Sequence, residues 1–223
     1  KFERSTELFK YLVTQAVNNF KEFGFDFYWA LRSEMKHSLA HGQIYKLMLI
    51  KILLGINETD RKDLLKTEQI LQSLAHITKA VSNIAHNMKG ACPSAQIKYV
   101  QKRLLDSQLE RLNKQLLKIA ESDNIPYFKL PFSYTVLLDQ FVIDKSKIMD
   151  SKKAPIMLFI RKYGLENQKT YAGGRIKPLY CTMFKCGDDL RQDMLVIQLL
   201  QVMNNIWLSQ NMNLCMKLYS VIP

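Results

Sequence analysis

Hydrophobic positions in the first part of the chain recur at helical spacing. Leu8, Leu12, Ala16 and Phe20 follow one stripe, which predicts a first helix that ends where Gly24 interrupts the pattern. Residues 25–37 are predicted as a second, aromatic-rich helix, and residues 43–54 as a third. Residues 55–57, Gly-Ile-Asn, then mark a turn.

Two longer helices follow. Between residues 64 and 88, leucine, valine, alanine, methionine and threonine alternate at spacings of three and four, and Gly90 suits a helix C-cap. Cys-Pro-Ser at residues 92–94 breaks the chain, and residues 97–119 carry a further apolar stripe. These stripes are interpreted as faces that pack in a core. A coiled coil is disfavoured, because the repeat is short and lacks a strict two-position seam.

The pattern changes near residue 125, where short segments rich in β-forming residues begin. The expected strands are residues 134–138, 141–143, 156–161, 179–185 and 214–221. Residues 164–177 should form a mobile loop between two strands, and residues 190–208 a helix. The fold class is therefore α+β: an α-helical segment followed by a small antiparallel sheet with one helix.

Composition narrows the class of protein. The 223 residues are 48% hydrophobic, too rich for a disordered chain, and no apolar run is long enough to cross a membrane. No signal peptide opens the sequence. The four cysteines form no Cys-x-x-Cys pair, so free thiols in a reducing compartment are expected instead of a zinc site. The net charge of +12 suits an anionic partner, which could be nucleic acid, a phosphoinositide-rich membrane or nucleotide phosphate.

The most informative stretch is residues 184–193, Phe-Lys-Cys-Gly-Asp-Asp-Leu-Arg-Gln-Asp. A strand delivers Lys185, Gly187 permits a turn, and Asp188 or Asp189 can cap the next helix. A lysine at the end of a sheet suits an anionic phosphate, because its ammonium is a compact charge on a long stem. Such a pattern more often belongs to an ordinary strand–turn–helix junction than to a phosphate site. The residue types and their order alone leave both interpretations open.

Three segments resemble the phosphoinositide 3-kinase family. Residues 187–193, Gly-Asp-Asp-Leu-Arg-Gln-Asp, resemble the signature of the 3- and 4-kinases, and the following residues resemble its helix. Residues 147–155, Lys-Ile-Met-Asp-Ser-Lys-Lys-Ala-Pro, resemble the phosphate-binding loop of class I catalytic subunits. Residues 27–35 look like a segment of the class I helical domain. The resemblance covers nearly the whole chain, weakly between about residues 55 and 130.

The resemblance implies a fragment with three parts. Residues 1–56 correspond to the C-terminal part of the helical (PIK accessory) domain, residues 57–125 to connecting helices, and residues 126–223 to the N-lobe of the lipid-kinase domain, without its C-lobe. In this family the N-lobe holds ATP against a five-stranded sheet.

The resemblance also implies an ATP-binding role for particular residues. Lys185 matches the lysine that contacts phosphate, and Ser151 with Lys152 or Lys153 matches the loop at the terminal phosphates. The remaining matches are Met149 and Pro155 at the adenine roof, Met183 at the pocket wall, and Asp193 with Tyr219 facing each other in the inner pocket. From residue type alone, both methionines could be plain core, the loop lysines could be solvated, and Asp193 could pair with Lys185 or Arg191.

Departures from the family pattern matter as well. Met157 stands where a Trp is usual, which puts the aromatic shelf of the nucleotide site in doubt, and Cys186 replaces an Asn. The chain contains neither an Asp-Arg-His-x-x-x-Asn catalytic loop nor an Asp-Phe-Gly metal-binding segment. No catalytic residue and no metal ligand is therefore expected in this chain. The Mg²⁺ ligands would lie outside it, and the fragment alone should be inactive.

The leading hypothesis is a phosphatidylinositol 3-kinase that transfers the γ-phosphate of ATP to the 3-hydroxyl of phosphatidylinositol lipids, the 4,5-bisphosphate above all. The resemblance implies a phosphoinositide lipid and a regulatory subunit as partners, with a cytoplasmic enzyme recruited to membranes. Alternatives are a truncated, non-catalytic binding module from such a gene and a phosphoinositide kinase of another class. A nucleic-acid-binding protein has little support, because no zinc finger or RNA-recognition signature is present.

Overall fold

The computed structural model describes residues 2–35, 41–88, 90–151, 154–164 and 179–222. It forms two compact units that interleave along the sequence. The first unit consists of Lys1–Arg61, Leu130–Tyr134 and Asp188–Pro223, and the second of Lys62–Lys129 and Thr135–Gly187. The domain boundaries expected near residues 56 and 125 stay predictions.

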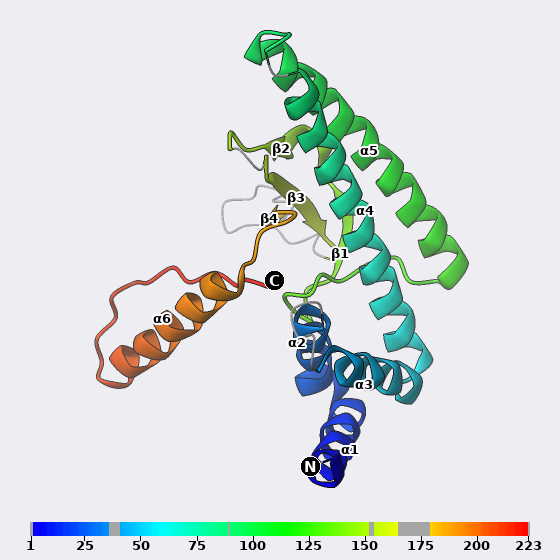
Figure 1. Cartoon of the computed structure of the whole chain (residues 1–223), viewed down its shortest axis with the longest axis vertical. Coiled ribbons are helices and arrows are strands. Elements are labelled where there is room, and N and C mark those ends of the chain that lie inside the picture. Colours follow the sequence, from blue (N-terminus) through cyan, green and yellow to red (C-terminus); the bar gives the residue numbers. More distant parts are fainter. Residues whose placement is uncertain (1, 36–40, 89, 152–153, 165–178, 223) are drawn as a thin grey trace. The chain divides into compact units, whose positions relative to one another are not determined.

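The first unit opens with helices, as the sequence pattern predicts. They are α1 (Phe2–Asn18), the π-helical turn η1 (Phe20–Gly24), α2 (Phe25–Glu34) and α3 (Gly42–Gly55) (Figure 1). The second helix begins at Phe25 as predicted, but the first α-helix ends at Asn18, before the expected end at Gly24. The N–H of Gly24 donates to the carbonyl of Asn19, and the π-helical turn leads directly into α2. A Cβ at Gly24 would lie 2.0 Å from the carbonyl oxygen of Ala16, so only glycine fits this turn.

An aromatic cluster forms the core of these helices. Phe20 and Phe25 meet Tyr134 edge to face, with ring centroids 6.0 and 5.6 Å apart, and Trp29 packs against Phe25. The hydroxyl of Tyr134 donates to Asp60 over 2.7 Å. Edge-to-face contacts favour a defined ring geometry, so this cluster holds the segment around Tyr134 against the helices.

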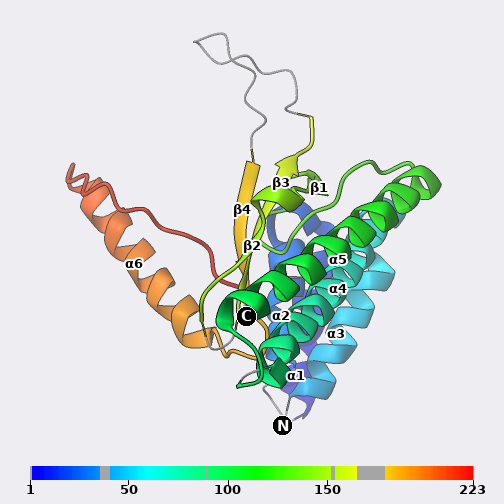
Figure 2. The ribbon, with the colours of Figure 1, turned by 90° about the horizontal axis from the view of Figure 1, so that it is seen from above.

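Two long helices and the sheet make up the second unit. Helix α4 (Glu58–Met88) begins in the first unit, continues through the second, and is followed by α5 (Ser94–Asp123), which returns beside it (Figures 1 and 2). The side-chain amide of Gln101 on α5 donates to the carbonyl of Val81 on α4. Gly90, between the helices, has a φ of 84°, which agrees with its predicted capping role.

The sheet is antiparallel and centred on one strand. Its elements are β1 (Leu138–Phe141), the 3-10 turn η2 (Ile143–Lys145), β2 (Lys147–Ile148), β3 (Ile156–Lys162) and β4 (Leu179–Phe184). Strand β3 pairs with β1 and β2 on one side and with β4 on the other. Ile156, Leu158 and Ile160 are fully buried. Helix α5 contacts β1, η2 and β2, so one face of the sheet packs against this helix (Figure 2). The other face, called the open face below, carries the exposed side chains of Cys181 and Met183.

The structure confirms the fold class and shifts some strands. The expected strands at residues 156–161 and 179–185 are β3 and β4. The strands expected at residues 134–138 and 141–143 are wrong in their bounds, because one strand, β1, lies between them and Tyr134 is drawn into the aromatic cluster instead. The loop expected at residues 164–177 lies almost wholly outside the described residues.

Helix α6 (Arg191–Ser209) follows the sheet, as predicted, but the last expected strand is absent from the described residues. Residues 213–222 form no strand. Asn211 and Cys215 have φ values of 59° and 53°, and the N–H of Cys215 bonds to the side chain of Asn213. A left-handed residue within this segment is incompatible with a regular ladder. The sheet therefore has four described strands, where the resemblance implies five.

Candidate nucleotide site

A tight loop joins β2 to β3. The N–H of Met149 donates to the carbonyl of Pro155 over 2.8 Å, and the N–H of Ala154 donates to the carbonyl of Ser151 over 2.9 Å. Ala154 has a φ of 44°, which is uncommon for a residue with a side chain. Pro155 and Ala154 are buried, whereas Ser151 is exposed. The loop is thus anchored at its C-terminal end, and Ser151 is exposed to solvent.

The strand register places this loop beside Lys185. Ile156, the first residue of β3, pairs with Phe184, the last residue of β4. Because the two strands are antiparallel, the next residues outward are Pro155 and Lys185, at the same end of the sheet. Two segments about 30 residues apart in sequence, both singled out by their resemblance to the family, therefore meet at one edge.

The open face of the sheet carries side chains next to this edge. Met157 pairs with Met183, and side chains alternate across a strand, so Met183 and Lys185 project to the same face. Met183 is 45% exposed, which excludes the interpretation of this residue as plain core, and Lys185 is exposed. The open face thus offers two thioether side chains followed by a cation at the strand end.

The turn after Lys185 has the predicted geometry. Gly187 has a φ of 82°, which a residue with a side chain rarely adopts. The carboxylate of Asp189 accepts the N–H of Arg191, the first residue of α6, and also binds the guanidinium of Arg191 over 2.7 Å. This hydrogen bond raises the pKa of Arg191. Asp189 therefore stabilises the start of α6, and Arg191 has its partner here and not in Asp193.

Two of the other expected site residues belong to a different compact unit from Lys185. Asp193, in the first turn of α6, and Tyr219 are exposed, and both belong to the first compact unit, whereas Lys185 belongs to the second. Their expected facing arrangement stays a prediction. Met149 is half-buried beneath the loop. Lys152 and Lys153 lie outside the described residues.

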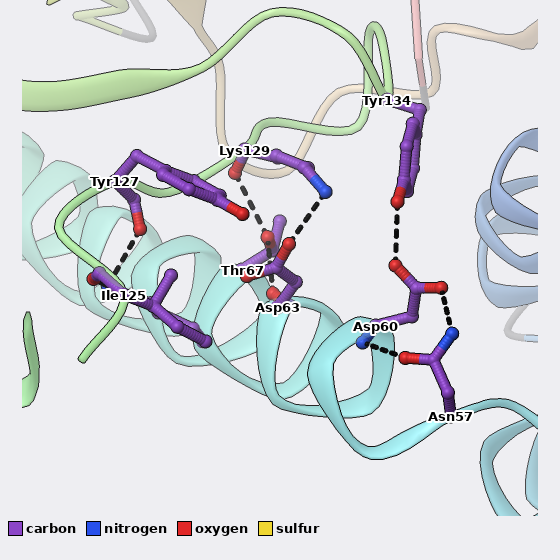
Figure 3. A network of polar contacts seen from close by, with 9 residues as sticks. Asn57, Asp60, Asp63, Thr67, Ile125, Tyr127, Lys129 and Tyr134 are labelled. Atoms are coloured by element: carbon purple, nitrogen blue, oxygen red, sulfur yellow. Dashed lines mark hydrogen bonds and ion pairs between the residues drawn. The ribbon is translucent and has the colours of Figure 1, made fainter. Parts of the chain in front are cut away.

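A buried polar cluster holds the chain that leads into the sheet, and the sequence pattern gave no sign of it. Lys129 Nζ lies 2.6 Å from Asp63, and Lys66 Nζ donates to the carbonyls of Ile125 and Tyr127 (Figure 3). The hydroxyl of Thr67 donates to the carbonyl of Lys129 over 3.0 Å. Three polar residues of α4, which make four contacts, therefore fix residues 125–129. Only the unusual burial of two lysines, which is not visible in sequence, could have revealed them.

Among the helices that the structure describes, none has both the length and the apolar character of a membrane-crossing segment.

Sequence comparisons relate this chain to known proteins. The family profile described as phosphatidylinositol 3- and 4-kinase matches residues 180–223, which hold β4, the turn and α6. Phosphatidylinositol 3-kinase 2 of Dictyostelium discoideum is 34% identical over 98% of this chain and 10% of its own length. Phosphatidylinositol 3-kinase age-1 of Caenorhabditis briggsae is 28% identical over 95% of the chain and 16% of its own length. Phosphatidylinositol 3-kinase VPS34 of Candida glabrata is 26% identical over 96% of the chain and 20% of its own length.

The chain thus spans between a tenth and a fifth of the length of these relatives. The matches extend over the helices as well as the sheet, because each covers at least 95% of the chain.

Proposed function

We propose that this chain, a segment similar to phosphatidylinositol 3-kinases over nearly its whole length, supplies the phosphate-binding edge of an enzyme that transfers the γ-phosphate of ATP to the 3-hydroxyl of a phosphatidylinositol lipid. The observation that carries the proposal is the register of β3 and β4, which brings the loop at residues 149–155 beside Lys185. The resemblance assigns phosphate contacts to both segments, and the strand register places both at the same end of the sheet.

The residues at this edge fit a nucleotide. Lys185 stands exposed at the end of β4, where its ammonium can bind phosphate oxygens. Ser151, with Lys152 or Lys153, would contact the terminal phosphates. Met183 and Met149, with Pro155, would form the apolar walls against the adenine ring. The two methionines at the Met157–Met183 pair can take the place of an aromatic shelf, since thioether side chains adapt to flat apolar surfaces.

Phosphoryl transfer depends chiefly on positioning and on neutralising the charge of the transferred group. Lys185 contributes a fixed positive charge, and the loop contributes hydroxyl and amide donors. Mg²⁺, when bound, would supply further charge neutralisation, and we expect its ligands to lie outside this chain. Asp193 and Tyr219 would line the inner pocket. The 223 residues contain no catalytic-loop motif. The isolated chain should therefore show no turnover.

The remaining features of the enzyme are proposed from the family. A phosphoinositide at a membrane surface is the acceptor, with the 4,5-bisphosphate as the leading candidate. A regulatory subunit is the expected protein partner, and the enzyme would be cytoplasmic and recruited to membranes. The excess of positive charge favours an anionic lipid surface.

The test uses the full-length protein that contains this segment, assayed with ATP and phosphatidylinositol vesicles. Lys185→Ala should lower turnover by about a hundredfold or more, the scale for losing one pre-organised charge contact. Lys114→Ala is the matched control, because Lys114 forms an exposed ion pair with Glu110 on α5. Equal activity of Lys185→Ala and wild type would contradict the assigned role of Lys185.

A further inference from the structure

The loop at residues 149–155 carries a negative charge at its tip. The Asp150 carboxylate lies next to Ser151, which the proposed function assigns to the terminal phosphates. A free carboxylate at this place would repel an anionic triphosphate. Phosphate binding at Ser151 therefore requires that the charge of Asp150 is neutralised or that its carboxylate points away from the phosphates.

Helix α5 provides a cation at this point. Lys98 Nζ, in the second turn of α5, lies 2.6 Å from Oδ2 of Asp150. The two residues are 52 positions apart in sequence. The contact joins α5 to the loop. The hydrogen bond between Met149 and Pro155 joins the two ends of the loop.

The helix that carries Lys98 is itself fixed to its surroundings. The side chain of Asn113 exchanges two hydrogen bonds of 2.9 Å with the backbone of Phe141 in β1. Gln101 donates to the carbonyl of Val81, and Lys102 to the carbonyl of Ile143. Lys98 thus stands on a helix that is bonded to α4 and to the sheet region through residues C-terminal to it.

A cavity of about 340 Å³ lies between this part of α5 and the loop. Lys98, Lys102 and Lys147 contribute to its lining, together with Met149, Asp150 and Ser151. Lys102 pairs with Asp106 on its own helix. The positive charge beside the loop therefore comes from side chains of α5 and β2, and Asp150 and Ser151 line the same cavity.

We propose that Lys98 is a positioning residue for the nucleotide site: its ammonium neutralises Asp150 and holds the loop tip so that Ser151, and not the carboxylate, meets the phosphates. This inference rests on the proposed function. The Lys98–Asp150 pair contributes little to the stability of the fold, because its side chains are 60% and 84% exposed and exposed ion pairs are weak.

The proposal separates Lys98 from Lys185 in the kinetics that each controls. Lys185 would act directly on the nucleotide, so its loss lowers turnover. Lys98 acts through Asp150, so its loss weakens nucleotide binding, and removal of the Asp150 charge restores that binding. If Lys98 instead contacted the phosphates directly, Asp150→Asn would lower the KM for ATP as much in wild type as in Lys98→Met.

The experiment measures the KM for ATP and kcat in the full-length protein, with the affinity of a hydrolysis-resistant ATP analogue as an independent reading. Lys98→Met should raise the KM for ATP about threefold to tenfold, the scale of a solvent-screened charge near a triphosphate, with kcat within about twofold of wild type. The double variant Lys98→Met with Asp150→Asn should return to the wild-type KM. Lys114→Met, which removes another exposed ion pair of α5, should leave the KM unchanged.

The possible results distinguish failure of the proposed function from failure of this inference. Wild-type protein that binds no ATP analogue contradicts the proposed function as a whole. Wild-type protein that binds the analogue, combined with Lys98→Met at the wild-type KM, overturns this inference alone. A raised KM that Asp150→Asn fails to rescue also overturns it, because Lys98 would then act without Asp150.

Discussion

Lys129 Nζ lies 2.6 Å from Oδ2 of Asp63, and both side chains are more than 95% buried. The pair joins the segment before the sheet to α4, 66 residues earlier in the chain (Figure 3). A buried ion pair adds little net stability, but the loss of one partner leaves an uncompensated charge in the core. The contact therefore fixes where the sheet starts relative to α4.

Lys129→Met should lower the free energy of unfolding by about 3 kcal/mol, the lower end of the range for breaking a buried pair, because Lys66 also attracts Asp63. Urea unfolding followed by circular dichroism measures the loss. The double variant Asp63→Leu with Lys129→Met should regain most of that stability. A double variant less stable than Lys129→Met would contradict the assignment of the cost to an unpaired Asp63.

Burial lowers the pKa of Lys66, against the opposing attraction of Asp63 and Asp123. The unfolded chain then holds more protons than the folded one between this lowered pKa and the ordinary lysine value of about 10.4. Stability due to Lys66 consequently rises with pH through that window. Unfolding free energies from pH 8 to 10 should rise less steeply for Lys66→Met than for wild type. Equal slopes in the two proteins would show that burial leaves the Lys66 pKa unshifted.

The π-helical turn gives a prediction about backbone packing. Gly24→Ala should destabilise the chain by about 1 to 3 kcal/mol or more, because the new Cβ would lie 2.0 Å from the carbonyl oxygen of Ala16. Thermal unfolding compares this variant with Glu22→Ala, an exposed position in the same turn. A Gly24→Ala protein as stable as Glu22→Ala would mean that α1 and α2 can separate at no cost.

Helix α6 exposes an apolar face. Leu195, Leu199, Val202 and Ile206 are each more than half exposed, and α6 has no buried residue. Exposed apolar surface of this kind binds hydrophobic dyes. The isolated chain should therefore bind such a dye, and Leu199→Ser with Val202→Ser should lower the signal. A monodisperse chain without dye binding would contradict this exposed arrangement.

Sequence pattern predicted the helices well, because each long helix has an apolar stripe that must be buried against a neighbour. It also predicted β3, β4 and the turn at Gly187, where local chemistry decides the conformation. The strand expected at residues 214–221 was wrong, because strand pairing depends on a partner edge and β-forming composition does not supply one.

The candidate site was only partly visible in sequence. Lys185 and the loop at residues 149–155 could be singled out by resemblance, but their adjacency follows from the β3–β4 register. The Lys98–Asp150 and Asp63–Lys129 contacts join residues more than 50 positions apart, so no local periodicity marks them. Thr67 was counted in an apolar helical stripe, whereas its hydroxyl bonds to the backbone of Lys129.

The most direct test of the account is the position of the phosphate that the full-length protein adds to phosphatidylinositol lipids. Radiolabelled ATP and vesicles containing phosphatidylinositol or its 4,5-bisphosphate would be used, and the deacylated product would be separated by chromatography. The account predicts label at the 3-position, lost in Lys185→Ala and retained in Lys114→Ala. Label at the 4-position, or no labelled lipid from a folded protein that binds ATP, would contradict it.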